Sequence, residues 1–372
     1  MAMPENIAAV CADRFVFRLA YAVCLRLLSL SQGRYDVLLV TEDNPDLDRL
    51  DVPRGLHIRL LDIDELVPAG GPTQLYGSAT YSRLHLPQIA GEGCKRIVYV
   101  DYDVAPVTSP APLFSLDLGG SGVAAVTDSI AERTLRVAAE SAAWGDRLQL
   151  LGIASIDSYF NAGCLLIDAE RWRRDGLTAA FAEIAGRFGK SLINCDQDIL
   201  NSHFHGKWAA LSPRWNFQEP SLGVGLEDVL SPALLHYYGS PKPWTLPDAD
   251  LKRGPCAPLA GIYAAAGWPD TLADVLALHS RKASRRERLR ARRRRLFGFL
   301  PRYRKEARQR WQERAIDMIR LIRRMRHDIA ASRYIDVEQG ISRIDQEALL
   351  RLERRLLSKL GPAAPPPAAS TG

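Results

Sequence analysis

The chain has 372 residues, of which 47% are hydrophobic and 25% charged, enough for two or three folding units with a sizeable buried core. No run of about 18 apolar residues occurs, which argues against a membrane-spanning helix, and residues 1–12 lack the basic and apolar blocks of a secretory signal. The six cysteines form no CxxC pair, so we expect reduced thiols in a cytoplasmic protein.

Positive charge is concentrated toward the C-terminal end of the chain. Residues 281–328 contain 20 Lys and Arg against 5 Asp and Glu, whereas the whole chain carries only +6, so the remainder is acidic. An acidic body joined to a basic segment suggests that the two parts have different tasks.

Short apolar runs alternate with amphipathic stretches up to about residue 245. The apolar runs predict strands at 37–41, 57–63, 96–101, 122–127 and 162–167, each bounded by Gly, Pro, Asn or Asp. Stretches between them, such as 14–30 and 177–188, have helical spacing. This alternation predicts an α/β layered domain with a mostly parallel sheet.

The last third of the chain has a different composition. Residues 246–271 are rich in Pro, Gly and Ala and predict a linker or lid. Residues 272–360 predict a basic, helical extension, because apolar residues recur there at helical spacing. Residues 361–372 are of low complexity and predict a disordered tail.

A pair of carboxylates follows the predicted strand at 96–101. Asp101 and Asp103 stand two residues apart at its end, which is where ligands bind in open α/β sheets. Such a pair can hold a hard divalent cation against a diphosphate. By itself the DxD triplet is also typical of surface carboxylates at the end of a strand.

Two further polar segments accompany apolar runs. Asn161 and Gly163 open the strand at 162–167, where an amide can bond a substrate hydroxyl or simply form a turn. Residues 194–201, NCDQDILN, place three polar acceptors before an apolar pair. The same pattern suits a helix N-terminus, so we expect Asp198 and Asn201 to be partly structural.

The segment HYYGSPKPW at 236–244 combines three useful residue types. His236 can ligate a transition metal, Gly239 allows close backbone approach to phosphate, and Lys242 supplies a positive charge for it. A lone histidine after an apolar run is often structural, but this combination favours a binding role.

The order and wording of these segments resemble glycosyltransferase family 8, which includes bacterial lipopolysaccharide galactosyl- and glucosyltransferases and, more distantly, glycogenin. The resemblance covers about residues 7–245 and rests on six segments in the family's order: TYSRLHLPQI, KRIVYVDYDV, YFNAGCLLID, DQDILN, RWNF and HYYGSPKPW. It implies that residues 1–245 form a Rossmann-like nucleotide-sugar-binding domain of the GT-A type. It also implies a UDP-sugar donor, retention of anomeric configuration, and Mn²⁺, with Mg²⁺ as the alternative.

The resemblance also assigns roles to single residues. Three would bind the metal: Asp101, Asp103 and His236. Seven would hold the donor: Asp13, Arg83, Asp128, Asn161, Ala162, Gly239 and Lys242. Two would lie near the anomeric carbon as the catalytic pair: Asp196 and Gln197. Residues 10–15 depart from the family's usual polar run, and only Asp13 clearly matches, so contacts to the nucleotide base are the least defined.

These features predict a retaining glycosyltransferase that moves glucose or galactose from a UDP-sugar to a saccharide or a lipid-linked saccharide. No carboxylate stands out as a nucleophile, which favours a front-face route with the leaving phosphate accepting the acceptor's proton. The sequence selects neither the sugar, the acceptor, the linkage nor the oligomeric state.

Two other functions fit parts of the sequence. A haloacid-dehalogenase-type phosphatase also carries DxD after an apolar strand, with Asp101 as nucleophile and Asp103 as acid–base, but it leaves residues 236–244 unexplained. The arginine run at 285–295 suggests nucleic-acid binding. The nearby aromatic residues, however, cluster with aliphatic ones, which argues against a nucleic-acid partner.

The basic extension has two open interpretations. Arginines on one face and Trp311, Ile319 and Ile322 on the other fit a helix lying on an anionic membrane. This would make the protein peripheral on the inner face of the cell membrane, which suits a lipid-linked acceptor. Alternatively, the apolar face packs on the acidic body.

Overall fold

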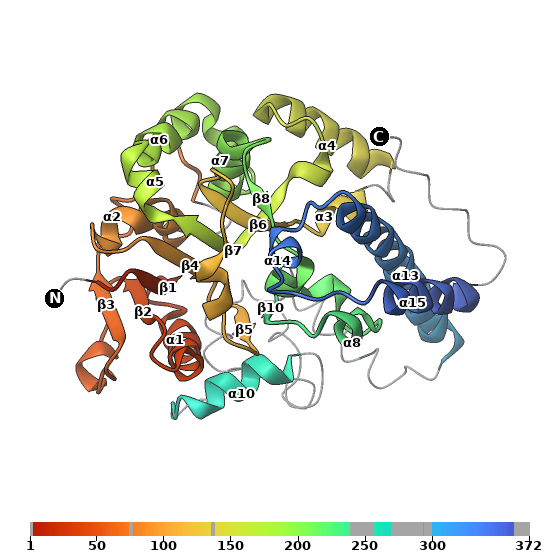
Figure 1. The fold of residues 1–372 in the computed structure, drawn as a ribbon, viewed down its shortest axis with the longest axis horizontal. Helices are drawn as coiled ribbons and strands as arrows, with labels where there is room; N and C mark the ends of the chain where they lie inside the picture. The colour runs from red at the N-terminus through yellow and green to blue at the C-terminus, as the bar shows by residue number, and fades with distance from the viewer. Residues whose placement is uncertain are drawn as a thin grey trace.

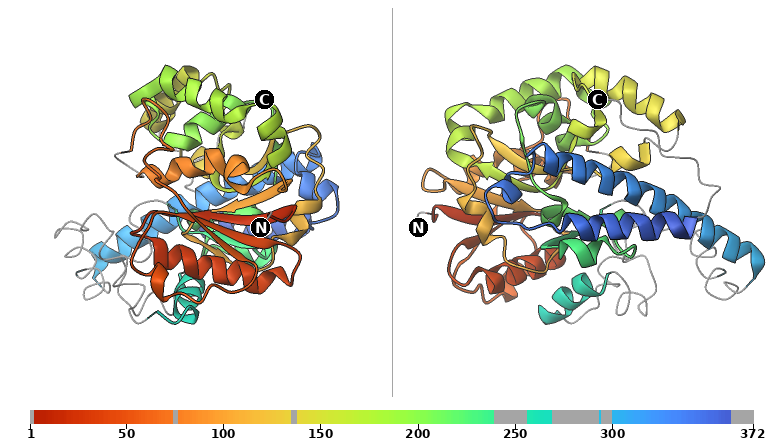
Figure 2. Two further views of the ribbon diagram at one scale, coloured as in Figure 1. Left: turned by 90° about the vertical axis from the view of Figure 1, so that its left-hand side faces the viewer. Right: turned by 45° about the vertical axis from the view of Figure 1, so that its right-hand side comes forward.

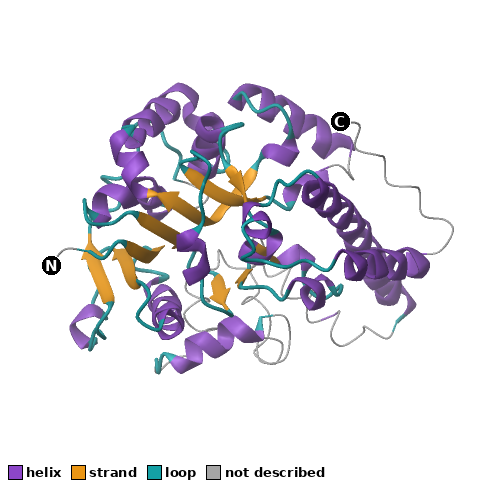
Figure 3. Cartoon of the chain, viewed as in Figure 1, coloured by secondary structure: helices purple, strands orange, loops and turns teal. Residues whose placement is uncertain are grey.

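The fold is built on one seven-stranded sheet with helices on both faces (Figures 1 and 3). The computed structural model describes residues 3–73, 77–134, 138–238, 256–268, 293 and 300–360. Its sheet has the order β3-β2-β1-β4-β7-β6-β8. The strands are β1 Asn6–Cys11, β2 Asp36–Thr41, β3 Leu56–Leu60, β4 Arg96–Val100, β6 Val123–Thr127, β7 Phe160–Asp168 and β8 Ala209–Ala210.

The sheet is mainly parallel, as the sequence predicts. β3, β2, β1 and β4 run parallel, and β6 is parallel to β8, whereas β7 runs antiparallel to both of its neighbours. All five predicted strands are present. The prediction missed β1 and β8 of this sheet, and it extended β3 to residue 63, whereas the strand ends at Leu60. It also named none of the short strands of the second sheet described below.

Side chains alternate between two hydrophobic cores, one on each face of the sheet. Along β1, Ala8 and Val10 enter one core, and Ile7 and Ala9 enter the other. One face is covered by α2 Leu86–Ala90, α5 Ala169–Arg174, α6 Leu177–Phe188 and α7 Cys195–Phe204, with α4 Ala138–Leu151 beside them (Figure 1). The other face is covered by α1 Phe17–Ser31 and, outside it, α10 Ala257–Ala265.

A second, three-stranded sheet lies beside the first and carries part of the site. It has the order β5-β10-β9, formed by β5 Val104–Pro106, β10 Leu234–His236 and β9 Phe217–Gln218. Short 3-10 turns carry Arg83 and Asn216: these are η2 Ser78–His85 and η6 Pro213–Asn216, and η7 Glu219–Ser221 follows β9. The remaining such turns are η1 Leu47–Arg49, η3 Ala111–Ser115, η4 Ile156–Ser158 and η5 Gly189–Ser191, and two short helices are α3 Ile130–Thr134 and α8 Leu226–Leu230.

The C-terminal segment packs on the body of the protein instead of standing apart from it (Figure 2). It consists of α13 Pro301–Ala330, α14 Ile335–Glu338 and α15 Gln346–Leu360. Helix α13 lies beside α15 and α3, and α15 lies beside α8. None of the described helices combines the length and apolar character needed to cross a bilayer.

The expectation that Ile319 and Ile322 insert into a membrane is wrong for these side chains. Ile319 is 1% exposed and Ile322 fully buried, and both belong to the core that includes Trp215 and Phe217. Only 5 Asp and Glu lie within residues 281–328, against 20 Lys and Arg. The structure supplies acids from elsewhere in the chain: Glu132 lies 2.6 Å from Arg324, and Glu353 pairs with Arg323 and Arg326.

Two other predicted segments have mixed outcomes. Part of the expected linker or lid at 246–271 is helix α10, which packs on α1, and Trp268 contacts Tyr21 edge to face at 5.7 Å between ring centroids. The expected disordered tail at 361–372 lies outside the described residues, as does most of 272–299.

Candidate active site

Two carboxylates and one imidazole meet where β4 ends. Asp101 and Asp103 follow β4, and His236 ends β10, which pairs antiparallel with β5. The Nε2 atom of His236 lies 3.3 Å from Oδ1 of Asp103 and 3.9 Å from Oδ2 of Asp101. One ligand atom from each of the three residues lies within 4.8 Å of the others. Sequence positions 101, 103 and 236 are thus brought together as predicted.

The imidazole of His236 is held in a fixed orientation. Its Nδ1 lies 2.9 Å from Oδ1 of Asn216, a carbonyl oxygen that only accepts, so Nδ1 carries the proton. The Nε2 lone pair is then directed toward the two carboxylates. Gly163 on β7 leaves space for the ring, because a Cβ there would overlap Cε1 of His236 and stand 2.9 Å from Oδ2 of Asp101.

This donor set suits a divalent cation. Carboxylate oxygens bind hard cations, and a neutral imidazole nitrogen extends the preference toward Mn²⁺ and its neighbours. His236 is 2% and Asp103 3% exposed, and two carboxylates this close repel each other without a cation between them. The geometry therefore fits a divalent cation at the three residues where the sequence predicts a metal.

The side chain of Arg83, in η2, contacts both the cation site and the segment that follows Asn194. Its guanidinium lies 2.9 Å from Oδ1 of Asp101 and 3.0 Å from Oδ2 of Asp196. It also donates to the carbonyl of Ala162 at 2.7 Å and lies over the ring of Tyr99. The nearby carboxylates outweigh burial and keep the pKa of Arg83 raised, so this buried side chain is a permanent cation.

Asp196 is almost completely buried at the start of α7. Cys195 before it has a left-handed φ of 46°, which turns the chain so that Asp196 faces Arg83. Thr80 donates to its other carboxylate oxygen. Burial raises the pKa of Asp196 to about 6, and Arg83 opposes that shift without cancelling it.

Gln197 and Asn161 both bind Asp128. The Nε2 of Gln197 and the Nδ2 of Asn161 each donate to Oδ2 of Asp128 at 3.0 Å. Gln197 also accepts from the amide of Ala162 at 2.9 Å. The Oδ1 of Asn161 accepts from Asn216 at 2.8 Å, so one hydrogen-bonded network runs from Asp128 to the residue that orients His236.

Most of the predicted site residues therefore share one network, with three exceptions. Asp13 lies in the turn between β1 and α1. Its carboxylate accepts hydrogen bonds from the backbone amides of Phe15 and Val16, which stabilises that turn. Its predicted donor role stays a prediction. Gly239 and Lys242 lie outside the described residues.

Asp198 and Asn201 have the structural roles expected of them. Asp198 accepts from the hydroxyl of Tyr159 at 2.6 Å, and Asn201 accepts from the amide of Phe160 at 2.7 Å. Sequence reasoning did not single out Asn216 or Tyr99. Asn216 stands in the quoted segment RWNF, which was the available signal, whereas Tyr99 looks like an ordinary strand residue.

Comparison with known proteins identifies the segment that carries this network. The family model for glycosyl transferase family 8 matches residues 70–246. Residues 70–246, just under half of the chain, are thus identified as a family 8 glycosyltransferase domain. General stress protein A of Bacillus subtilis is 28% identical over 257 residues, which are 63% of this chain and 85% of that protein. The lipopolysaccharide 1,3-galactosyltransferase of Salmonella typhimurium is 28% identical over 181 residues, 46% of this chain and 51% of that protein.

Another glycosyltransferase is matched over less of its length. Glycosyltransferase GlyF of Streptococcus pneumoniae is 26% identical over 177 residues, which span 37% of it. The family assignment removes the phosphatase interpretation, because the DxD pair belongs to a glycosyltransferase domain.

Solved structures confirm the GT-A fold. The galactosyltransferase LgtC, in complex with donor and acceptor sugar analogs, superposes with a TM-score of 0.57 at 23% identity, covering 70% of this chain and 95% of that one. The bifunctional glycosyltransferase WbbM superposes with a TM-score of 0.55 at 18% identity, covering 76% and 52%. The chain is thus a glycosyltransferase of GT-A fold with a helical C-terminal segment.

Proposed function

We propose that this glycosyltransferase is a retaining hexosyltransferase that moves glucose or galactose from a UDP-sugar to a saccharide acceptor with the help of a divalent cation. The observation that carries the proposal is the convergence of Asp101, Asp103 and His236 beside the buried Arg83. A cation on the first three would bind the diphosphate. Arg83 would hold charge on the donor next to it.

The cation is expected to be Mn²⁺, with Mg²⁺ as a weaker substitute. One imidazole in the ligand set favours Mn²⁺, because Mg²⁺ prefers oxygen ligands and an octahedral shell rich in water. When bound, the cation would offset the charge that develops on the leaving phosphate.

The residues around the donor favour a front-face route. Asp196 is engaged by Arg83 and Thr80, and Gln197 carries an uncharged amide, so neither is a strong nucleophile. In the proposed route the bond from C1 to the phosphate oxygen breaks, and the acceptor oxygen bonds C1 on the same face. The acceptor's hydroxyl proton passes to the departing phosphate oxygen. Asn161, Gln197 and Asp128 would orient the sugar hydroxyls.

A lipid-linked acceptor and a peripheral place on the inner face of the cell membrane remain predictions. The exposed, basic first half of α13 supports them in part, since Arg302, Arg304 and Arg308 face solvent there. Any membrane contact would run through such charged side chains, because the apolar face of α13 is buried in the core.

A donor panel tests the proposal directly. UDP-glucose, UDP-galactose, UDP-GlcNAc and GDP-mannose are each incubated with the full chain and Mn²⁺, Mg²⁺ or EDTA, and release of the nucleoside diphosphate is measured. We expect turnover of a UDP-hexose with Mn²⁺ and its loss in EDTA. Turnover that is unaffected by EDTA, or turnover of GDP-mannose alone, would overturn the assignment.

Asp103→Ala provides the matched test of the cation site. We expect it to remove Mn²⁺-dependent turnover and Mn²⁺ binding by calorimetry while the far-UV circular dichroism stays native. Asp43→Asn, which changes an exposed carboxylate elsewhere, is the control and should behave as wild type. Normal turnover by a folded Asp103→Ala protein would contradict the metal assignment.

A further inference from the structure

A buried ion pair holds helix α4 against the start of α7. Arg147 on α4 is 9% exposed, Asp198 on α7 is fully buried, and the guanidinium of Arg147 contacts Oδ2 of Asp198. Removing either partner would leave a buried charge without compensation, so this contact is costly to break. The pair therefore fixes the position of α7 relative to α4.

The carboxylate of Asp198 also closes the turn at the start of α7. Its Oδ2 accepts from the backbone amide of Asn194 at 2.9 Å, and its Oδ1 accepts from the hydroxyl of Tyr159 at 2.6 Å. The side-chain amide of Asn194 donates to the same hydroxyl at 3.0 Å. Asp198 thus stabilises the turn in which Asp196 and Gln197 stand.

This turn contains a backbone conformation that needs support. Cys195 has a left-handed φ of 46°, which is disfavoured for a residue with a Cβ and persists only where surrounding contacts hold it. The hydrogen bond from Asn194 to Asp198, the residues on either side, supplies such a contact. In this conformation Asp196 lies 3.0 Å from Arg83, so the placement of its carboxylate depends on the turn.

Aromatic side chains orient Arg147 toward Asp198. The guanidinium carbon of Arg147 lies 5.0 Å from the centre of the Trp144 ring, and the two rings of Trp144 and Tyr159 meet edge to face at 5.4 Å between centroids. Tyr159 is also the residue whose hydroxyl bonds Asp198. Helix α4 therefore presents the guanidinium in a fixed position.

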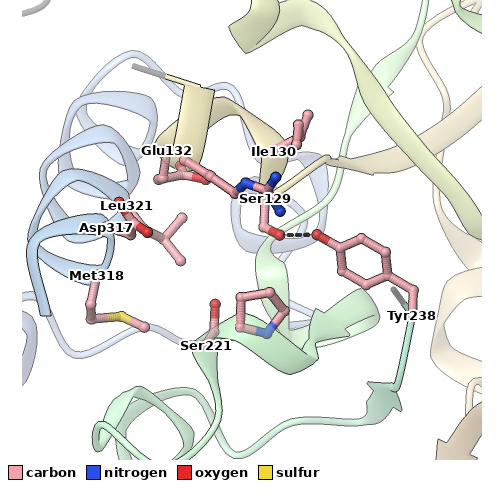
Figure 4. Close-up of a pocket in the computed structure, with 10 residues that line it drawn as sticks. Ser129, Ile130, Glu132, Ser221, Tyr238, Asp317, Met318 and Leu321 are labelled. Carbon is pink, nitrogen blue, oxygen red and sulfur yellow. Dashed lines mark hydrogen bonds between the residues drawn. The ribbon is translucent and has the colours of Figure 1, made fainter. Parts of the chain in front are cut away.

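The chain segment that contains α4 is held separately at its start. It runs from Asp128, directly after β6, to Asn161 in β7, and these two side chains are hydrogen-bonded to each other. The hydroxyl of Ser129 is bonded to that of Tyr238, as Figure 4 shows. Loss of Arg147 should therefore disturb the turn of α7 without releasing the start of the segment.

We propose that Arg147 is a positioning residue for sugar transfer. Through its ion pair with Asp198 it holds the turn of α7 so that Asp196 and Gln197 would face the anomeric carbon of the donor. The inference rests on the proposed function. The three cation ligands stand on other elements, so the ion pair should affect the rate of the transfer step and not the affinity for the nucleotide.

Arg147→Met tests the proposal, because it keeps most of the side-chain length and removes the charge. The assay uses the UDP-hexose that the donor panel identifies. We expect kcat to fall at least tenfold, while the Kd for UDP with Mn²⁺, measured by calorimetry, stays within twofold of wild type. Arg147→Lys restores a positive charge opposite Asp198, so its kcat should exceed that of Arg147→Met at least threefold.

Arg96→Met is the matched control. Arg96 pairs with Asp168 at 3.2 Å, at the ends of β4 and β7 that are distant from Asp101. This variant also loses an ion pair, but its kcat should stay within twofold of wild type. Assays run well below the unfolding midpoint of each variant.

Tyr159→Phe provides a second, milder test, which decides the question if Arg147→Met does not fold. It removes one hydrogen bond to Asp198 and keeps the ring that contacts Trp144. We expect kcat to fall at least threefold with an unchanged Kd for UDP.

The outcomes separate this inference from the proposed function. If wild type turns over no nucleotide sugar, the proposed function itself fails. If wild type is active and the folded Arg147→Met and Tyr159→Phe variants keep kcat within twofold, only the inference fails. It also fails if UDP affinity falls in parallel with kcat, or if Arg147→Lys is no more active than Arg147→Met, because the contact would then only stabilise the fold.

Discussion

The buried carboxylate of Asp336 accepts hydrogen bonds from the hydroxyl of Ser212 at 2.6 Å and from the indole Nε1 of Trp215 at 3.0 Å. It also accepts from the amide of Ser212 at 2.8 Å. This carboxylate belongs to α14 in the C-terminal segment, yet it fixes the turn that ends at Asn216. Asn216 in turn holds His236, so the C-terminal segment supports the cation site at one remove.

Removal of residues 300–372 should therefore unfold or severely destabilise the protein. The apolar face of this segment is part of the protein's core, so donor hydrolysis should be lost with it. Truncation would remove Met318, Ile322 and Met325, whose buried side chains each contribute roughly 1.5–3 kcal/mol, and would expose the core that they cover. Circular dichroism melts and gel filtration measure the effect. A chain that ends after Leu360 is the control, and a monodisperse, active product from the larger truncation would contradict the prediction.

Asp336→Asn should lower the free energy of unfolding by about 1–3 kcal/mol and weaken Mn²⁺ binding. Asparagine presents one acceptor oxygen in place of two, so at least one of the three donors from Ser212 and Trp215 loses its bond. Urea unfolding and calorimetric titration with Mn²⁺ check the two effects. Glu338→Gln, an exposed change on the same short helix, should alter neither. Equal behaviour of the two variants would show that Asp336 does not support the site.

Gly163→Ala should abolish cation binding in a folded protein. The added Cβ would occupy the space of the His236 ring and press on Asp101, which moves two of the three ligands. Gly186→Ala on α6 is the control, because nothing lies within 4 Å of the Cβ it adds. Mn²⁺ titration followed by electron paramagnetic resonance reports free ion directly. Wild-type affinity in Gly163→Ala would mean that His236 is not a ligand.

Asp196 should make the protein less stable as the pH rises from about 4 to 6. Burial raises the pKa of Asp196 from 3.8 to about 6 in the folded chain, so folding favours the protonated carboxyl. Because the unfolded carboxyl releases its proton at lower pH, the free energy of unfolding falls across this window. Asp196→Asn should remove that part of the slope, as measured by urea unfolding at pH 4.5 and pH 7. An identical pH dependence in the variant would contradict the shifted pKa.

The sequence predicts the cation site better than it predicts the packing of the C-terminal segment. Asp101, Asp103 and His236 stand in recognisable segments, and the sheet brings them together because each ends or follows a strand. The acidic partners of the arginines in α13 cannot be predicted from the sequence in this way. Glu132 and Glu353 are distant from Arg324 and Arg323 in sequence, so counting the charged residues around each arginine does not identify these partners.

Asn216 illustrates a second limit. Its neighbours in the sequence indicate a turn. Its role in the site depends on two long-range hydrogen bonds, to Asn161 and His236, which form only after the two sheets have assembled. The strand β1 was missed for a simpler reason. Its residues 6–11, NIAAVC, contain two alanines, which weaken the strand signal although the segment is central in the sheet.

The bond from Asp336 to Ser212 spans 124 residues, and this has a consequence for synthesis on the ribosome. At a translation rate of roughly 5–20 residues per second, about 6–25 s pass between the appearance of the two partners. During that interval Trp215 lacks its acceptor, and the core that α13 and α15 later cover is open to water. The nascent chain therefore cannot complete its core until the C-terminal helices have been synthesised. Until then its apolar surface is exposed, and this interval is the stage at which aggregation or binding by chaperones is most favoured.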